Sequence, residues 1–260
     1  MQKKTISAAL FVLLVFLAVS AVMSGALAQT GEEEIKAAQQ LQDFDHMVLQ
    51  SRLEIRQYCA LVQTLFKEDD SAKKSKALEH IRQAGLLWEQ VRLKYETQPP
   101  AAYRADDAFG ARMEAVQQGI RDMETQLAES HVKEAFQACS MTCGLFVKLH
   151  EENHLVYAAD RLFHLRKLAK KIIDEEQKSG LSSVQGMMAD LLKSRDQVLL
   201  APCPAPRDPA RRQSYQAALK NLSAQLDELT IHVVNKEPEP AGKILKDLIA
   251  VINVAYGIAL

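Results

Sequence analysis

Cysteines and histidines in the middle of this chain are the residues best suited to chemistry. The segment CSMTCGLFVKLHEENH, residues 139–154, holds two cysteines four residues apart and an H-E-x-x-H string. Thiolates and imidazoles bind soft or borderline metal ions such as Cu(I) and zinc, and paired thiols form disulfides. Cysteines also pack inside helical proteins as small hydrophobic residues. The segment therefore suggests four alternatives: a metal site, a disulfide, a protease signature or a packed helix face.

The string HEENH has the ligand spacing of a zinc protease. On a continuous helix, His150 and His154 would lie one turn apart and bind zinc, and Glu151 would activate a water molecule. However, no strand that could align a substrate is predicted, and no third ligand follows in a recognisable motif. The sequence favours packed residues where two helices meet, with regulatory zinc binding and zinc-dependent hydrolysis as the alternatives.

Hydrophobic periodicity predicts that the chain is all-α. Two stripes share the helical spacing 4-3-4-3-4 at an offset of 106 residues, and no segment alternates with period two. The stripes are Phe109, Met113, Val116, Ile120, Met123 and Leu127, and then Tyr215, Leu219, Leu222, Leu226, Leu229 and Val233.

Proline-rich loops at 97–107 and 201–210 and short polar turns divide the chain into eight expected helices. Short connections favour antiparallel neighbours, so the sequence predicts two tandem antiparallel four-helix bundles, residues 29–150 and 151–260. The expected helices are 34–66, 73–97, 105–129, 131–150, 152–178, 183–199, 209–234 and 241–258. Because no strong breaker separates residues 131 and 178, the fourth helix is free to run straight into the fifth and join the bundles end to end.

Four sulfur- or nitrogen-bearing side chains are expected at one level of the first bundle. Counting 1.5 Å per residue from the expected helix ends places Cys59, His80, Met123 and Cys139 about 10–14 Å below the same end, with Cys143 one turn deeper. We expect Cys59 to form a disulfide with Cys139 or Cys143, because the first and fourth helices are neighbours. The alternatives are a soft-metal site for copper, formed by these five residues, and buried free thiols.

The two predicted bundles are treated as repeats of one unit. At the positions that correspond to the cysteines of the first bundle, the second bundle carries aliphatic residues, so this fold forms without cysteine at those positions. Alignment by stripe places Leu248 opposite Cys139, Ile252 opposite Cys143 and Ala169 opposite Cys59. Cys203 lies in the loop APCPAP, and it is expected to be a free surface thiol or an intermolecular link. The basic run RKLAKK, residues 166–171, is expected to be a solvated helix face, with an anion site as the alternative.

The first 28 residues are typical of a secretory signal peptide. Lys3 and Lys4 precede a long uncharged run, and Ala26-Leu27-Ala28 forms a cleavage site before Gln29. The alternative is an uncleaved membrane anchor, because the run is long enough to span a bilayer. Removing two lysines changes the net charge from −1 to −3, which argues against nucleic-acid binding. The mature chain shows no further spanning segment and is expected to be periplasmic or secreted.

The segment VKEAFQACSMTCGLFVKLH, residues 132–150, resembles the last helix of cytochrome c′ and its haem-binding relatives such as cytochrome b562. The resemblance implies a four-helix bundle. In cytochrome c′ this helix carries C-x-x-C-H, and its histidine ligates haem. When Cys143 is aligned with the first cysteine, Phe146 replaces the second and Val147 replaces the histidine, so covalent haem is not expected.

Together these features predict an exported, non-enzymatic helical binding or interaction protein with an unidentified protein partner. Its expected site is the cysteine, methionine and histidine layer, with copper as the candidate ion. The alternatives are a zinc-dependent hydrolase and a structural protein whose first bundle is held by a disulfide.

Overall fold

The computed structural model describes residues 5–204 and 208–260, with side chains from residue 32 onward. Within these ranges all regular structure is helical and no strand occurs, which confirms the predicted all-α class. The elements are α1 (Thr5–Leu65), α2 (Ser71–Tyr95), η1 (Ala101–Tyr103), α3 (Phe109–Ala128), α4 (Val132–Glu151), α5 (Ala158–Ser179), α6 (Leu181–Val184), η2 (Gln185–Met187), α7 (Met188–Leu200), α8 (Pro209–Val234) and α9 (Pro238–Ala259).

Aspartate caps begin two of the helices that the sequence predicted. The Asp70 carboxylate accepts hydrogen bonds from the backbone of Ala72 and Lys73 at the start of α2. Asp208 accepts one from Arg211, and Pro209 occupies the first turn of α8. A side-chain oxygen at this position satisfies backbone donors that the helix leaves free, and proline fits there because it has no N–H to satisfy.

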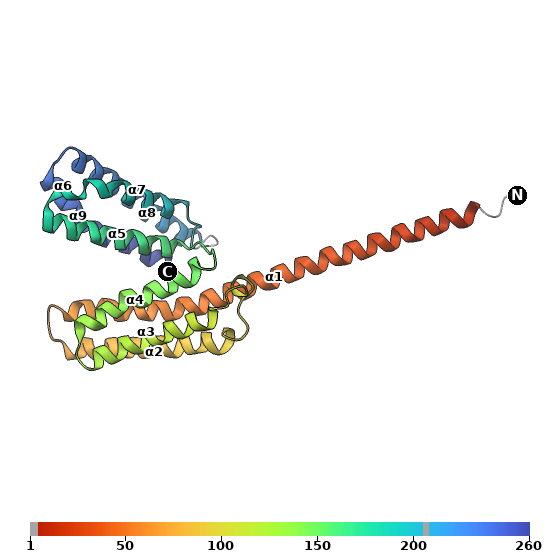
Figure 1. The fold of residues 1–260 in the computed structure, drawn as a ribbon, viewed down its shortest axis with the longest axis horizontal. Coiled ribbons are helices and arrows are strands. Elements are labelled where there is room, and N and C mark those ends of the chain that lie inside the picture. The colour runs from red at the N-terminus through yellow and green to blue at the C-terminus, as the bar shows by residue number, and fades with distance from the viewer. Residues whose placement is uncertain (1–4, 205–207) are drawn as a thin grey trace.

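The helices enclose two hydrophobic cores (Figure 1). α1 to α4 surround the first, which contains most of the aromatic side chains, and the indole nitrogen of Trp88 donates to the Met113 carbonyl at 3.0 Å. α5 to α9 surround the second, which is mostly aliphatic. Leu49, Leu53 and Cys143, from α1 and α4, also pack against the second core, so the two helix groups lie side by side.

Buried positions recur between the two groups at nearly constant spacing. At an offset of 106, buried residues of α3 and α4 match buried residues of α8 and α9. At an offset of 107, residues of α1 and α2 match those of α5, α6 and α7. These two offsets pair Cys139 with Leu245 and Val62 with Ala169. The alignment made from the sequence alone had instead paired Cys139 with Leu248 and Cys59 with Ala169.

Three helices end in the same way, with a non-glycine residue in the left-handed region. Ser130, His154 and Lys236 have φ values of 65°, 58° and 60° and follow α3, α4 and α8. In each case the next residue's N–H bonds to the carbonyl five residues back, for example Leu155 to His150 at 3.0 Å, which is a Schellman ending. Ser130 and Lys236 are again 106 residues apart.

The expectation that the fourth helix continues into the fifth is wrong. α4 ends at Glu151, and the Schellman turn at His154 leads into an extended Tyr157 at φ −117° before α5 begins. The Asn153 amide strengthens this ending by donating to the Leu149 carbonyl at 2.9 Å and to the Asp106 carboxylate at 3.0 Å. The chain therefore turns back at this point, and α5 runs beside the first group instead of extending it.

The N-terminal part of α1 extends beyond the rest of the protein (Figure 1). The predicted signal peptide falls here: residues 1–4 lie outside the described residues, and of 5–28 only the backbone is described. In the part of the chain with described side chains, no helix is long and apolar enough to cross a membrane.

Candidate ligand site between the two cores

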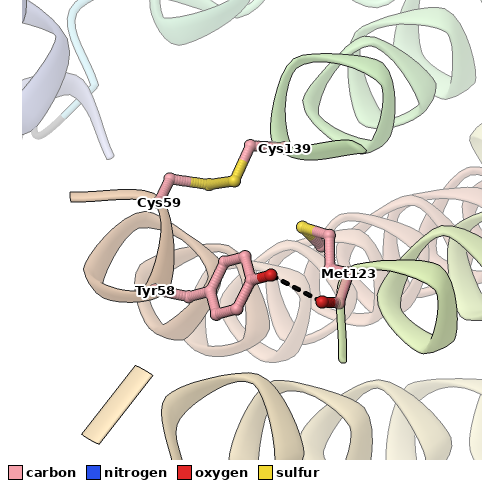
Figure 2. The surroundings of a disulfide bond; sticks show 4 residues. All are labelled: Tyr58, Cys59, Met123 and Cys139. Atoms are coloured by element: carbon pink, nitrogen blue, oxygen red, sulfur yellow. Dashed lines mark hydrogen bonds between the residues drawn. A yellow bond between two sulfur atoms is a disulfide. The ribbon is translucent and has the colours of Figure 1, made fainter. Parts of the chain in front are cut away.

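The predicted disulfide between the first and fourth helices is present. Cys59 on α1 is bonded to Cys139 on α4, with their Cα atoms 6.0 Å apart. Figure 2 shows the bond with Tyr58 and Met123 beside it, and the Tyr58 hydroxyl donates to the Met123 carbonyl at 2.6 Å. The geometric prediction from helix rise is confirmed, with Cys139 as the partner.

The other residues of the predicted metal layer have different surroundings. His80 Nδ1 lies 2.6 Å from a Glu54 carboxylate oxygen, Met123 is fully buried in the first core, and Cys143 remains a free thiol. Among residues with described side chains, no group of three or more His, Cys, Asp or Glu could hold a metal ion. Metal binding by this layer stays a prediction. In the oxidised protein two of the five proposed ligands, Cys59 and Cys139, are bonded to each other and are not available as thiolates.

The HEENH residues do not lie on one helical face. His150 is buried on α4, whereas His154 lies beyond the helix end and is exposed. Glu151 accepts hydrogen bonds from His164 Nε2 at 3.0 Å and Arg161 Nη1 at 3.3 Å, on the solvent side. The zinc interpretation assumed a continuous helix, and the end of α4 at Glu151 separates the two histidine ligands.

A buried ionic network instead surrounds His150. His150 Nδ1 donates to Asp160 Oδ2 at 2.5 Å, and Arg52 Nη2 donates to Asp160 Oδ1 at 3.3 Å. The side chains of Arg52, His150 and Asp160 are 9%, 3% and 3% exposed. They come from α1, α4 and α5, so this network joins the two helix groups across 108 residues of sequence.

Electrostatics keep Asp160 ionised in this environment. Burial alone would raise its pKa, but the hydrogen bond from His150 and the charges of His150 and Arg52 outweigh burial and hold the pKa below its usual value. Asp160 also lies in the first turn of α5, where the helix dipole favours a negative charge.

A second part of the network reaches a carboxylate with one free oxygen. The Tyr157 ring packs on the His150 ring with centroids 4.2 Å apart, and its hydroxyl donates to Asp45 Oδ2 at 2.7 Å. Asp45 Oδ1 is buried and has no hydrogen-bond partner among the described residues. Burial raises the pKa of Asp45, and the Tyr157 hydrogen bond only partly opposes this effect.

This network forms one wall of a cavity that we call the junction cavity. It encloses about 790 Å³ between α1, the α4–α5 connection, the α7–α8 loop and the end of α9. Its lining is mainly apolar, with a few convergent polar groups, which is the usual composition of a small-molecule site. Its lining includes Leu41, Asp45, Arg52, His150, Tyr157 and Cys203.

Sequence analysis did not identify most of this site. Arg52 and Asp45 interrupt the apolar stripe of α1, and an arginine in a core stripe is a signal that a partner must exist elsewhere. Cys203 is a free thiol, as expected, but it is half-buried in the cavity lining and packs against the second core. Phe146 and Val147, which align with the second cysteine and the histidine of the haem-attachment motif, are both buried core residues.

Comparison of the chain with protein-family models, curated proteins and solved structures finds no match. Its function must therefore be argued from the geometry of the site.

The disulfide should contribute strongly to stability, because it closes a long loop between residues separated by 80 positions. Chain entropy predicts that replacing Cys59 and Cys139 together by alanine lowers the free energy of unfolding by about 4–5 kcal/mol. Thermal unfolding followed by circular dichroism measures the loss. Cys143→Ala serves as the control and should lower stability much less. Equal melting temperatures for wild type and the double variant would contradict the prediction.

Asp160→Asn should destabilise the protein at neutral pH by roughly 3–5 kcal/mol, because it leaves Arg52 buried without its counter-charge. The folded-state pKa of Asp160 is lowered, so its ionic contribution is present above the unfolded pKa of about 3.9 and is lost as pH falls through the lower folded value. The difference between variant and wild type should therefore shrink below about pH 4. Urea unfolding at pH 7 and pH 3 tests this, with the exposed Asp174→Asn as control. A difference independent of pH would contradict the ionic role.

Proposed function

We propose that this chain is an exported, non-enzymatic binding protein built from two tandem four-helix bundles, with a ligand site in the junction cavity. The observation that carries the proposal is the buried network of Arg52, His150 and Asp160 in the wall of a cavity of about 790 Å³. A buried ionic group is weak evidence for stability alone, because a well-packed apolar junction would serve as well. Its presence beside a cavity supports a binding role.

The recurrence of buried positions supports the tandem-bundle part of the proposal. Buried residues of the four helices α1 to α4 match buried residues of the second helix group at offsets of 106 or 107, and α3 and α8 end in the same turn. The matched buried residues in the last helix of each group are Ala135, Cys139, Thr142, Phe146, Leu149 and His150, and then Ala241, Leu245, Leu248, Ile252, Ala255 and Tyr256. Gene duplication followed by divergence at the junction explains this pattern, since Arg52 and His150 match Ala159 and Tyr256, which carry no charge.

The cavity wall indicates what the ligand must provide. Its apolar lining favours a hydrophobic body, and the Asp45 carboxylate in the wall favours a hydrogen-bond donor such as a hydroxyl or amine. A mainly apolar molecule with one donor is therefore the ligand class that fits best.

A purely structural role remains the second candidate, and the Cys59–Cys139 disulfide favours it. In that case the junction would only hold the two helix groups together. The binding proposal requires in addition that the cavity accepts a molecule, which a direct measurement can decide.

The neutral dye N-phenyl-1-naphthylamine should bind the junction cavity with saturable, one-to-one stoichiometry. Its fluorescence rises in apolar surroundings, and it carries one N–H donor that could reach Asp45. Leu41→Trp should weaken binding at least tenfold, because the larger ring occupies the cavity that Leu41 lines. Fluorescence titration measures the affinity.

Leu61→Trp is the matched control: it changes another half-buried leucine of α1, which lines neither this cavity nor the smaller one. Its affinity for the dye should equal that of wild type. Equal weakening by both substitutions, or dye binding without saturation, would leave the structural role as the better account.

Export predicts processing between Ala28 and Gln29. When the full chain is expressed in a bacterium with a secretion pathway, the intact mass of the purified protein should correspond to a chain that begins at Gln29. Ala26→Lys and Ala28→Lys together should block cleavage, because the cleavage site requires small residues. A mature mass that retains residues 1–28 would favour the anchor alternative.

A further inference from the structure

A second, smaller cavity lies between α1, α4, α5 and α9, and we call it the basic cavity. It encloses about 240 Å³, and Arg52 lines both this cavity and the junction cavity. Four cationic side chains line it, and no acidic side chain does: Arg52, Arg56, Arg166 and Lys170.

Among the described side chains, an ion pair within 4.0 Å is found for one of these four cations. Arg52 is paired with Asp160. Among the residues with described side chains, Arg56, Arg166 and Lys170 form no ion pair within 4.0 Å, and the carboxylate of Leu260 pairs with none of them. The charge is therefore uncompensated where the two helix groups meet.

The three free cations are held in place by neutral groups. Arg166 Nη1 donates to Asn253 Oδ1 at 3.2 Å, and its guanidinium lies 5.4 Å from the centre of the Tyr256 ring. The Lys170 ammonium lies 5.7 Å from the Phe136 ring centre. Such contacts with ring faces orient a cation without neutralising it.

α9 approaches Arg56 closely through a glycine. A Cβ on Gly257 would come within 2.5 Å of both terminal nitrogens of Arg56, so the glycine leaves room for the guanidinium in its present position against this helix. The positions of the cations are thus set by packing rather than by acidic partners. Consistent with crowded positive charge, burial and the nearby Arg166 lower the pKa of Lys170, and the more weakly acting Asp174 does not restore it.

We propose that the basic cavity binds a small organic anion. A carboxylate or phosphate group would contact Arg56, Arg166 and Lys170, since such groups accept the paired hydrogen bonds that guanidinium groups offer. The short apolar part would lie against Ile55, Phe136 and Phe146, which also line the cavity. This site is distinct from the proposed ligand site in the junction cavity, and the neutral dye used there does not test it.

Phenyl phosphate is a suitable probe, with inorganic phosphate and phenol as its separate halves at constant ionic strength. At about one hundred times its Kd, phenyl phosphate should raise the melting temperature of the full protein by on the order of 5 °C. Inorganic phosphate should raise it less at equal concentration, and phenol should have no effect. Equal shifts with phenyl phosphate and inorganic phosphate would overturn the organic part of the assignment.

Two double variants that remove the same amount of positive charge distinguish specific binding in the cavity from nonspecific attraction of an anion to a basic protein. Arg166→Gln with Lys170→Gln removes cavity cations and should abolish the phenyl phosphate shift. Lys167→Gln with Lys171→Gln removes exposed cations of the same helix and should keep it. In the absence of ligand the cavity variant should be at least as stable as the control, because it relieves repulsion. Equal phenyl phosphate shifts in both variants, or none in wild type, would overturn the proposal.

A measurement on the wild-type protein does not depend on any variant folding. The free thiol Cys143 lines the basic cavity, and the free thiol Cys203 lines the junction cavity. Iodoacetate, an anion, and neutral iodoacetamide both alkylate thiols, in each case by displacement of iodide by the thiolate. The iodoacetate-to-iodoacetamide rate ratio, followed by peptide mass spectrometry, should be several-fold higher at Cys143. Phenyl phosphate should lower the rate at Cys143 alone. Equal ratios at both thiols, with no protection, would count against an anion site.

Discussion

The ionic contact of Asp160 with Arg52 and His150 is the interaction on which the arrangement of the two helix groups depends. All three side chains are almost fully removed from water, and removing one partner from such a contact leaves an uncompensated charge. Apolar packing tolerates sliding of one surface over another, whereas these hydrogen bonds require one relative position. The walls of both cavities come from both helix groups, so their shape follows from this contact.

The contact exists only because α4 ends where it does. On a continuous helix, the ten residues between His150 and Asp160 would separate them by about 15 Å along the axis. The left-handed turn at His154 reverses the chain, and Asp160 returns to within 2.5 Å of His150. A local backbone conformation at one exposed residue thereby determines a buried tertiary contact.

Sequence periodicity and helix rise were sufficient to predict the all-α class, most helix ranges and a disulfide from Cys59 to Cys139 or Cys143, because these features depend on local spacing and on neighbouring helices. The end of the fourth helix near residue 150 was expected, but the reversal of the chain after it was not, because glycine is the usual residue in a left-handed turn and His154 is not a glycine. The ionic network was missed because Arg52 and Asp160 are 108 residues apart, and a single sequence does not show which polar residues meet. The basic run at 166–171 was expected to be a solvated face, which holds for Lys167 and Lys171 but not for Arg166, which lines the basic cavity.

The disulfide and the ionic network together explain how unpaired cations can stay close to one another. α1 and α4 are joined covalently at Cys59 and Cys139, and seven residues before Cys59 on α1, Arg52 binds Asp160 of α5. The basic cavity lies between these two fixed points and includes residues from both. Repulsion among Arg56, Arg166 and Lys170 cannot separate α1 from α5 without breaking the buried ion pair. The fold therefore keeps several positive charges together between α1, α4, α5 and α9, where a bound anion would interact with more than one of them at once.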